Sequence, residues 1–137
     1  MKIASCDDEI DFGQELRTLL TRWAVNNDLS LTLYQYTNGD DLLTALQTTS
    51  MDLIFLDIIM PLLNGIDTAR ELRNAGITVP IIFLTYSREF ALESYEVKAL
   101  NYLLKPINNH RLFSVLDEFL NDFEASAETF TAHTADG

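Results

Sequence analysis

Five residues with reactive side chains each follow a stretch of apolar residues in this chain. They are Asp7, Asp8, Asp57, Thr85 and Lys105. Each stands where an apolar run stops, and the carboxyl ends of parallel strands all point to the same edge of a sheet. We therefore expect three carboxylates, a hydroxyl and an ammonium to meet at one edge, although they are spread over about a hundred positions of sequence.

Such a group of side chains could transfer a phosphoryl group. Neighbouring carboxylates repel one another unless a cation neutralises them, and all-oxygen ligands select a hard ion such as Mg²⁺, with Mn²⁺ as an alternative. Asp57, held beside that ion, would be a competent nucleophile toward phosphorus and would form an acyl phosphate. Lys105 would supply positive charge, and Thr85 a hydroxyl, for the transferred oxygens.

Taken one at a time, these residues also have purely structural explanations. Asp7 and Asp8 could form a helix cap or a turn, and Asp57 could be a solvated acid at a strand end. Thr85 could simply favour a strand, and Lys105 alone means little. Their joint occurrence at four strand ends, in this order and spacing, favours a shared site.

The elements that would position them alternate along the chain. Apolar runs predict strands at residues 3–6, 31–35, 53–57, 79–85 and 100–104. Apolar residues at helical spacing, together with capping residues, predict helices at 10–26, from 39, at 65–74, at 89–95 and at 108–123. Five strands alternating with five helices imply an α/β fold with a parallel sheet covered on both faces.

The last predicted helix and the residues after it differ from the rest. Its apolar residues occupy an arc of roughly 160°, wider than the roughly 100° that packing on one sheet requires. The excess is either core or a surface for another chain. Residues 124–128 are small and polar, which predicts a linker. Residues 129–137 alternate like a strand that begins a second domain, with a disordered tail as the alternative.

Composition narrows the functional classes. The chain has 137 residues, 47% of them hydrophobic, which suits one domain with a core. Its 21 acidic and 9 basic residues give a formal net charge of −12, which argues against this chain alone gripping nucleic acid. No apolar run is long enough to span a membrane, and the early acidic residues argue against a secretory signal. Cys6 is expected to be a buried, inert thiol, so we expect a cytoplasmic protein.

Four motifs together resemble the receiver domain of bacterial two-component response regulators. They are Cys-Asp-Asp-Glu at 6–9, Leu-Asp-Ile-Ile-Met-Pro-Leu-Leu-Asn-Gly at 56–65, Leu-Thr at 84–85 and Tyr-Leu-Leu-Lys-Pro-Ile at 102–107. The resemblance covers residues 2 to about 124, and the combination is highly specific. It implies a flavodoxin-like, doubly wound fold similar to that of CheY, with five parallel strands in the order 2-1-3-4-5.

The resemblance also implies a ligand set. Asp57 would be the phosphoacceptor, taking its phosphoryl group from a sensor histidine kinase. Asp7, Asp8 and Asp57 would hold Mg²⁺, and the backbone carbonyl of Ile59 would complete the protein ligands. The protein would not be an enzyme beyond self-phosphorylation from a phosphodonor and slow autodephosphorylation.

The remaining matched positions would couple the phosphate to a change of state. Lys105 would contact the phosphate, and the peptide bond before Pro106 would be cis. Thr85 and Tyr102 would form the switch pair, with the hydroxyl moving to the phosphate and the ring turning inward. Phosphorylation would then favour a homodimer through the fourth helix, fifth strand and fifth helix.

A narrower resemblance concerns the end of the chain. Residues 90–107 resemble receivers joined to LytTR-type DNA-binding domains, the LytR/AlgR/AgrA group, and residues 130–137 resemble the first strand of such a domain. This implies a receiver over residues 1–124, then a linker and the truncated start of a LytTR-type domain over 125–137. The parent would be a transcription regulator that contacts DNA only through that C-terminal domain.

Two positions depart from the commonest receiver pattern. Tyr86 follows the switch threonine, where a small residue is usual, and Ile59 stands where many relatives carry a polar side chain. Both bulky groups could screen the acyl phosphate from water, so we hypothesise a long-lived phosphorylated state. Tyr86 could equally be a packing or partner-contact residue.

Three rival functions remain open from the sequence. A haloacid-dehalogenase-like phosphohydrolase also uses an aspartate nucleophile with Mg²⁺, but it normally has a second acid where this chain has Ile59. A flavin-binding flavodoxin-like module is disfavoured by acids where a phosphate-cradling loop should be. The third rival is a stand-alone receiver that acts through protein contacts.

Overall fold

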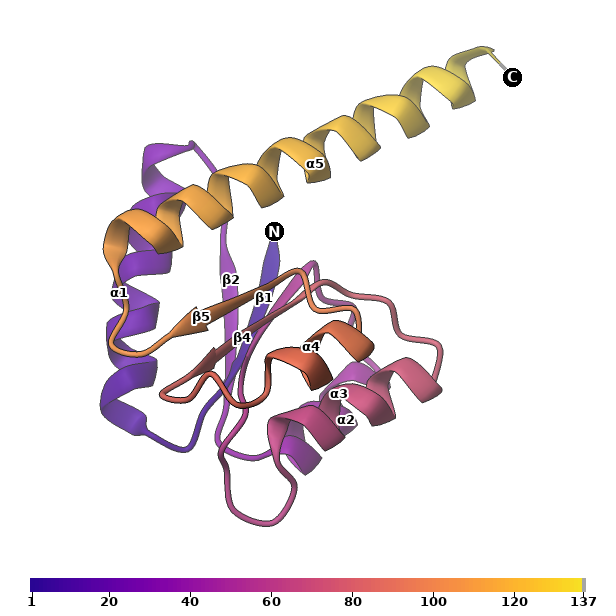
Figure 1. The fold of residues 1–137 in the computed structure, drawn as a ribbon. Helices are drawn as coiled ribbons and strands as arrows, with labels where there is room; N and C mark the ends of the chain where they lie inside the picture. The colour runs from indigo at the N-terminus through magenta and orange to yellow at the C-terminus, as the bar shows by residue number, and fades with distance from the viewer. Residues whose placement is uncertain (137) are drawn as a thin grey trace. The chain divides into compact units, whose positions relative to one another are not determined.

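A five-stranded parallel sheet forms the centre of the structure, which is a computed structural model (Figure 1). It describes the backbone of residues 1–136 and the side chains of residues 1–126. The strands are β1 (Lys2–Cys6), β2 (Thr32–Tyr36), β3 (Leu53–Asp57), β4 (Ile81–Thr85) and β5 (Asn101–Leu104). Their order is β2-β1-β3-β4-β5, and every pair is parallel, which confirms the predicted fold class.

Helices follow the strands in alternation. They are α1 (Ile10–Asn26), α2 (Gly39–Leu46), α3 (Gly65–Asn74), α4 (Ala91–Glu96) and α5 (Asn109–Asp136). The chain divides into two compact units, residues 1–106 and residues 107–137. The first unit contains the whole sheet and the first four helices, and the second contains α5.

The register of the sheet brings the strand ends level with one another. Cys6 lies opposite Leu56, and Leu56 lies opposite Phe83, which in turn pairs with Tyr102. The residues that come next in each strand or loop therefore emerge at the same edge, as the parallel arrangement predicts. This edge is where the reactive side chains are found.

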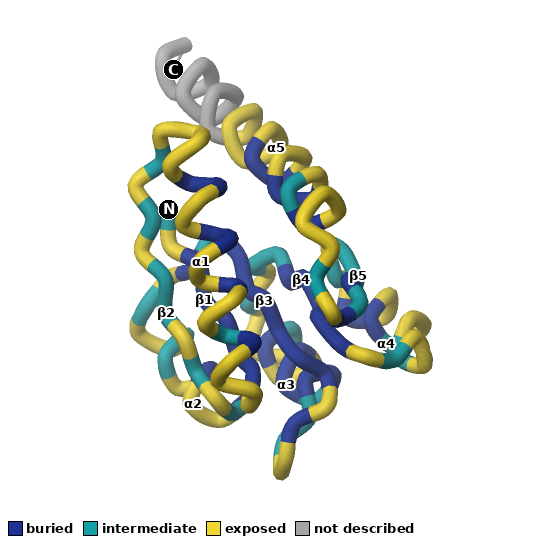
Figure 2. The backbone as a smooth tube through the Cα atoms, turned by 90° about the vertical axis from the view of Figure 1, so that its left-hand side faces the viewer, coloured by how far each residue is buried: buried dark blue, intermediate teal, exposed yellow. Residues whose placement is uncertain are grey.

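The core of the first unit explains why the central strands are so apolar. Strands β3 and β4 are buried along their whole length, whereas β2 at the edge is only partly buried (Figure 2). Alternate strand residues, such as Ile54 and Phe83, pack with Leu42 of α2 and Leu72 of α3. The residues between them point to the opposite face, which α1 covers (Figure 1).

The loop after β3 is closed tightly against the strand that carries Asp57. Asn64 caps α3, because its side-chain oxygen accepts a hydrogen bond from the backbone N–H of Asp67 at 2.9 Å. The N–H of Gly65 donates to the carbonyl of Ile58 at 2.8 Å. A β-carbon at position 65 would lie 2.1 Å from the backbone oxygen of Asp57, so only glycine fits there.

Helix α5 is longer than the sequence predicts. It continues to Asp136, so the helix end predicted at residue 123 and the strand predicted from residue 129 are wrong, whereas the linker predicted over residues 125–137 stays a prediction. The physical reason is composition: residues 109–136 contain neither proline nor glycine, and alanine and glutamate favour helix in the segment interpreted as a linker. Side chains beyond residue 126 lie outside the described residues, and the domain boundary predicted at residue 124 stays a prediction.

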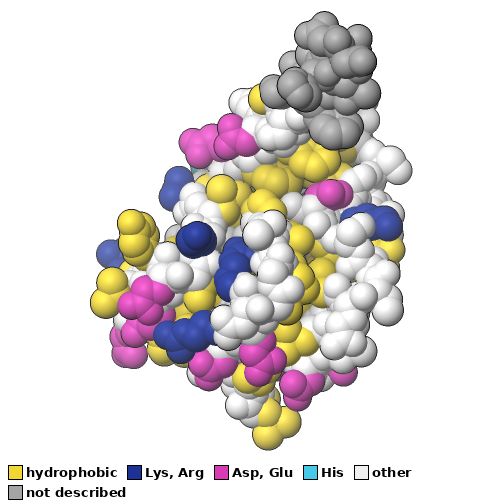
Figure 3. Space-filling model, turned by 90° about the vertical axis from the view of Figure 1, so that its right-hand side faces the viewer, with side chains coloured by type: hydrophobic (Ala, Val, Ile, Leu, Met, Phe, Trp, Pro, Cys, Tyr) yellow, Lys and Arg dark blue, Asp and Glu magenta, His cyan; other side chains and the backbone are white. Residues whose placement is uncertain are grey.

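The surface is mixed in charge. On the face shown in Figure 3, Lys and Arg side chains lie among acidic and hydrophobic ones. Arg70 illustrates this, because it forms ion pairs with Asp67 at 3.2 Å and with Glu96 at 3.7 Å. Among the described residues, none of the helices is long and apolar enough to cross a membrane.

We predict opposite effects of alanine at two glycines. Gly65→Ala should lower the free energy of unfolding by roughly 2 kcal/mol or more, because backbone atoms of the Asp57 loop would have to move. Gly13→Ala, in the interior of α1, should raise the free energy of unfolding by up to about 1 kcal/mol, because alanine favours helix. The added β-carbon would fit, since the nearest atom, Nε2 of Gln35, would be 3.5 Å away. Urea denaturation of both variants checks this, and equal effects would contradict it.

Candidate functional site

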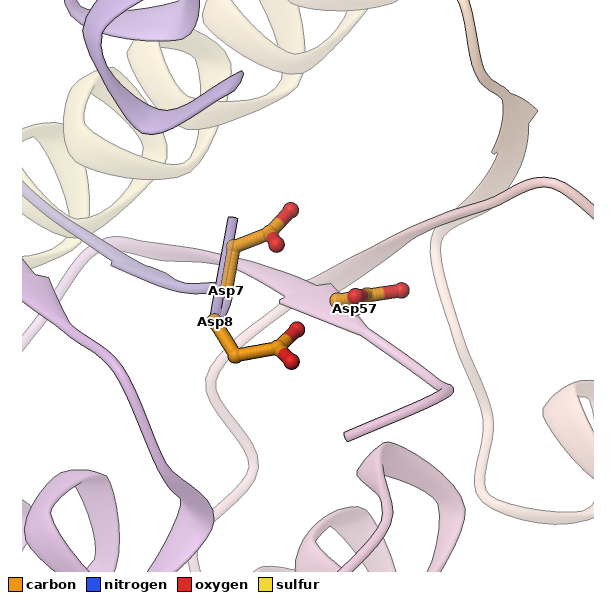
Figure 4. Close-up of side chains that lie close together, drawn as sticks. All are labelled: Asp7, Asp8 and Asp57. Atoms are coloured by element: carbon orange, nitrogen blue, oxygen red, sulfur yellow. The ribbon is translucent and has the colours of Figure 1, made fainter. Parts of the chain in front are cut away.

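Three carboxylates lie together at the carboxyl edge of the sheet. Asp57 is the last residue of β3, and Asp7 and Asp8 follow the end of β1, the neighbouring strand. Their side chains project to the same side (Figure 4), and one oxygen of each lies within 4.8 Å of the others. Asp7 and Asp57 are buried, whereas Asp8 is exposed. The structure therefore brings together the three acids that the sequence predicts to share a site.

The ammonium of Lys105 lies among these acids. Its Nζ atom is 2.7 Å from Oδ2 of Asp7 and 3.5 Å from Oδ2 of Asp57. A third carboxylate, that of Glu9, is 3.8 Å away. The Lys105 side chain is fully buried, so these ion pairs replace the water that a lysine normally keeps. Lys105 directly follows β5. Its backbone N–H donates a hydrogen bond to the carbonyl oxygen of Thr85 at 2.8 Å.

Two aromatic rings complete the surroundings of Lys105. Nζ lies 4.1 Å from the centroid of the Phe12 ring and 5.1 Å from that of the Tyr86 ring. A cation is attracted to the face of an aromatic ring at such distances. The ammonium is therefore held both by charged partners and by aromatic rings.

Burial controls the charges at this site. It raises the pKa of Asp57 from 3.8 to about 7, and the neighbouring charge of Asp7 acts in the same direction. Lys105 and the backbone N–H of Ile59, which donates to the Asp57 carboxylate, act against this rise. Burial alone would lower the pKa of Lys105, but the bond to Asp7 and the charges of Asp57 and Glu9 raise it above its ordinary value.

The donor set fits a hard divalent cation. Asp7, Asp8 and Asp57 offer carboxylate oxygens within reach of one ion, without competition from a histidine or thiolate ligand in that group. Three carboxylates lie near a single ammonium here, so this edge of the sheet carries more negative charge than Lys105 offsets. A bound cation would relieve that excess.

Thr85 and Tyr102 are linked through the loop that follows β4. Thr85 is fully buried at the end of β4, and its hydroxyl oxygen accepts a hydrogen bond from the N–H of Ser87 at 3.4 Å. The hydroxyl of Tyr102 donates to the carbonyl oxygen of Ser87. Ser87 thus contacts both members of the predicted switch pair. Neither of these hydrogen bonds involves Asp57.

The three other predicted positions lie around the site. The peptide bond between Lys105 and Pro106 is cis, as predicted. The side chain of Ile59 is 57% exposed, so its predicted screening of a phosphoryl group stays a prediction. Tyr86 is also exposed, but its hydroxyl donates to Oε2 of Glu9 at 3.1 Å, and this bond raises the pKa of Tyr86.

Sequence reasoning missed two residues that contact Lys105. Glu9 follows Asp8 directly, so a rule that looked one residue further past β1 could have found it. Phe12 lies about one helical turn before Leu16 on the same face of α1, so its burial was predictable. Its contact with Lys105 was not. Cys6, in contrast, is buried as predicted, and burial raises the pKa of its thiol to about 12.

Comparison with known proteins identifies the family of this chain. A family profile described as the response regulator receiver domain matches residues 3–117. The chain is 31% identical over 125 residues to the protein MrkE of Klebsiella pneumoniae, a match that covers 90% of this chain and 45% of MrkE. It is 37% identical over 111 residues to the sensory transduction protein LytT of Oceanobacillus iheyensis, covering 80% of this chain and 44% of LytT.

A solved structure gives the same result. The crystal structure of the response regulatory domain of MrkE from Klebsiella pneumoniae matches with a TM-score of 0.80 and 31% identity. The match covers 91% of this chain and 99% of that domain, although this chain spans less than half the length of the two curated relatives. The sequence profile, the relatives and the shared fold show that this chain belongs to the response regulator receiver domain family.

Proposed function

We propose that Asp57 is the phosphoacceptor of a two-component switch, with a sensor histidine kinase as the donor. The observation that carries this proposal is that three separate strand ends meet at one point. The ammonium nitrogen of Lys105 lies 2.7 Å from a carboxylate oxygen of Asp7 and 3.5 Å from one of Asp57. A carboxylate oxygen of Asp57 attacks phosphorus, the bond from phosphorus to the donor breaks, and an acyl phosphate forms. Self-phosphorylation and slow autodephosphorylation are the only reactions in this proposal.

Asp7, Asp8 and Asp57, with the carbonyl of Ile59, would hold Mg²⁺ or Mn²⁺. When bound, the ion supplies positive charge beside the carboxylates and the incoming phosphoryl oxygens. Lys105, already within 3.5 Å of Asp57, supplies a second positive charge on the chain itself. Thr85 would donate its hydroxyl hydrogen to a phosphoryl oxygen, and a movement of the hydroxyl toward the phosphate would alter its present contact with the N–H of Ser87.

The switch would act through the loop after β4. Ser87 accepts from Tyr102 and donates to Thr85, so a movement of the Thr85 hydroxyl toward the phosphate changes a contact of the residue that holds Tyr102. A phosphoryl group adds charge and acceptor oxygens, and it would bias an existing equilibrium between two arrangements of this pair. Phosphorylation would then favour a homodimer through α4, β5 and α5.

The switch would serve transcription through an attached domain. The relative LytT is described as a sensory transduction protein, and this chain spans less than half of it. We propose a parent regulator of the LytTR type, in which DNA is contacted only by the C-terminal domain. A stand-alone receiver that acts by protein contacts is the alternative, and it requires no further domain.

Phosphorylation at Asp57 predicts a specific mass change. After incubation with acetyl phosphate and Mg²⁺, the intact mass of the wild type should increase by one phosphoryl group, because acetyl phosphate can serve as a small donor. The Asp57→Asn variant should keep its mass, since an amide cannot form the acyl phosphate. Equal phosphorylation of both proteins would show that another residue is the acceptor.

The charge at Asp57 predicts a pH dependence of stability in metal-free protein. The folded state keeps a proton on Asp57 up to about pH 7, whereas the unfolded chain loses it near pH 3.8. The free energy of unfolding should therefore fall as the pH rises through this window. Asp57→Asn should remove that fall and be more stable than wild type at pH 8 by about 1 kcal/mol or more.

Urea denaturation in EDTA at pH 5 and pH 8 measures this difference. Glu71→Gln, which removes one charge from an exposed position of α3, should retain the pH dependence of the wild type. Added Mg²⁺ should stabilise the wild type at pH 8 more than Asp57→Asn, because only the wild type presents all three carboxylates. Parallel pH profiles for wild type and Asp57→Asn would contradict the assignment of this charge.

Dimerisation is the predicted output of the switch. Beryllofluoride with Mg²⁺ mimics the phosphoryl group, so it should increase the sedimentation coefficient of the wild type at high protein concentration. The Asp57→Asn variant is the matched control and should sediment as without the mimic. An identical mass for the wild type in both states would count against the dimer.

A further inference from the structure

The loops on either side of Asp57 are joined by one hydrogen bond. The hydroxyl of Tyr86 donates to Oε2 of Glu9 at 3.1 Å, across 77 positions of sequence. Tyr86 follows β4 and Glu9 follows β1, and these are the two strands that flank β3 in the sheet. The bond, called here the Tyr86–Glu9 bridge, therefore runs across the end of the strand that carries Asp57.

The residues of the Tyr86–Glu9 bridge are more exposed than the reactive groups near them. Asp57 is only 4% exposed and Lys105 only 5%, whereas Tyr86 is 62% exposed. Both partners of the bridge contact Lys105 beneath them: Glu9 lies 3.8 Å from Nζ, and the Tyr86 ring centroid lies 5.1 Å from it. The bridge therefore adjoins the buried ammonium that pairs with Asp57 at 3.5 Å.

We propose that Tyr86 and Glu9 are positioning residues whose bridge limits the access of water and small phosphodonors to Asp57. This inference rests on the proposed function, because it concerns the reactions of that aspartate. An exposed hydrogen bond of this kind breaks and reforms readily, since water competes for both partners. Asp57 would react during the fraction of time in which the bridge is open.

Two reactions should share this requirement. In phosphorylation, an Asp57 oxygen bonds to phosphorus as the bond to the donor breaks. In hydrolysis, a water oxygen bonds to phosphorus, the bond from phosphorus to Asp57 breaks, and a proton of that water is lost to solvent. If access is limiting, loss of the bridge raises both rates, whereas a change of charge next to Lys105 affects the two reactions unequally.

The experiment compares variants that separate the hydrogen bond from the ring and from the charge. Tyr86→Phe keeps the ring and removes the bond, and Glu9→Ala removes the bond from the other side. Glu9→Gln removes the charge but keeps an oxygen that can accept from Tyr86. Tyr95→Phe, which removes a hydroxyl from an 81% exposed tyrosine on α4, is the matched control.

The measured quantities are the phosphorylation rate with acetyl phosphate and the rate of phosphate loss from purified phosphorylated protein, both in Mg²⁺. We expect Tyr86→Phe and Glu9→Ala to raise both rates about two- to tenfold, the range that corresponds to one exposed hydrogen bond. Glu9→Gln should stay nearer to the wild type, and Tyr95→Phe should equal it. Urea denaturation confirms that each variant is folded.

The outcomes distinguish this inference from the function on which it rests. A wild type that takes no phosphate on Asp57 overturns the proposed function itself. A wild type that is phosphorylated, with Tyr86→Phe and Glu9→Ala unchanged in both rates, overturns the role of the bridge alone. So does a change in one rate only, or an effect of Glu9→Gln as large as that of Glu9→Ala, because charge would then explain it.

Discussion

The ion pairs of one buried lysine hold this site together. A buried ammonium is costly unless charged partners surround it. Lys105 meets this condition through Asp7 and Asp57, which come from the ends of two other strands. The pairing therefore constrains β5 relative to β1 and β3, and the aspartate that would react is fixed by the same contacts that stabilise the sheet edge.

The balance of charge at this edge also links stability to chemistry. One ammonium does not offset the nearby carboxylates, and burial, together with the charge of Asp7, raises the pKa of Asp57 to about 7. A bound cation would neutralise the excess negative charge of the carboxylates. An acyl phosphate on Asp57 would add negative charge to the same edge again. The loop after β4 is well placed to respond, since Tyr86 contacts Glu9 and Ser87 contacts both Thr85 and Tyr102.

Most of the fold was predictable because it depends on local patterns. Apolar runs that end in Asp57 or Lys105 reveal buried parallel strands and their edge, and α1 begins and ends where the predicted helix does. Contacts made by long side chains were not predictable in this way: the positions of Phe12 and Glu9 beside Lys105 depend on how α1 and the loops at the sheet edge pack against one another. The length of α5 was missed for a different reason, because a polar, alanine-containing segment can be either a linker or a helix.

In a member of the receiver family, this edge of the sheet is where a signal would be received. We propose that the acids at this edge form one cation site around Asp57. A crystal structure of the protein grown with Mn²⁺, with the ion located by its anomalous scattering, tests that claim most directly. We expect a single ion with oxygens of Asp7, Asp8 and Asp57 about 2.0 to 2.3 Å from it. An ion bound at another face, or no ion at these carboxylates at saturating Mn²⁺, would contradict it.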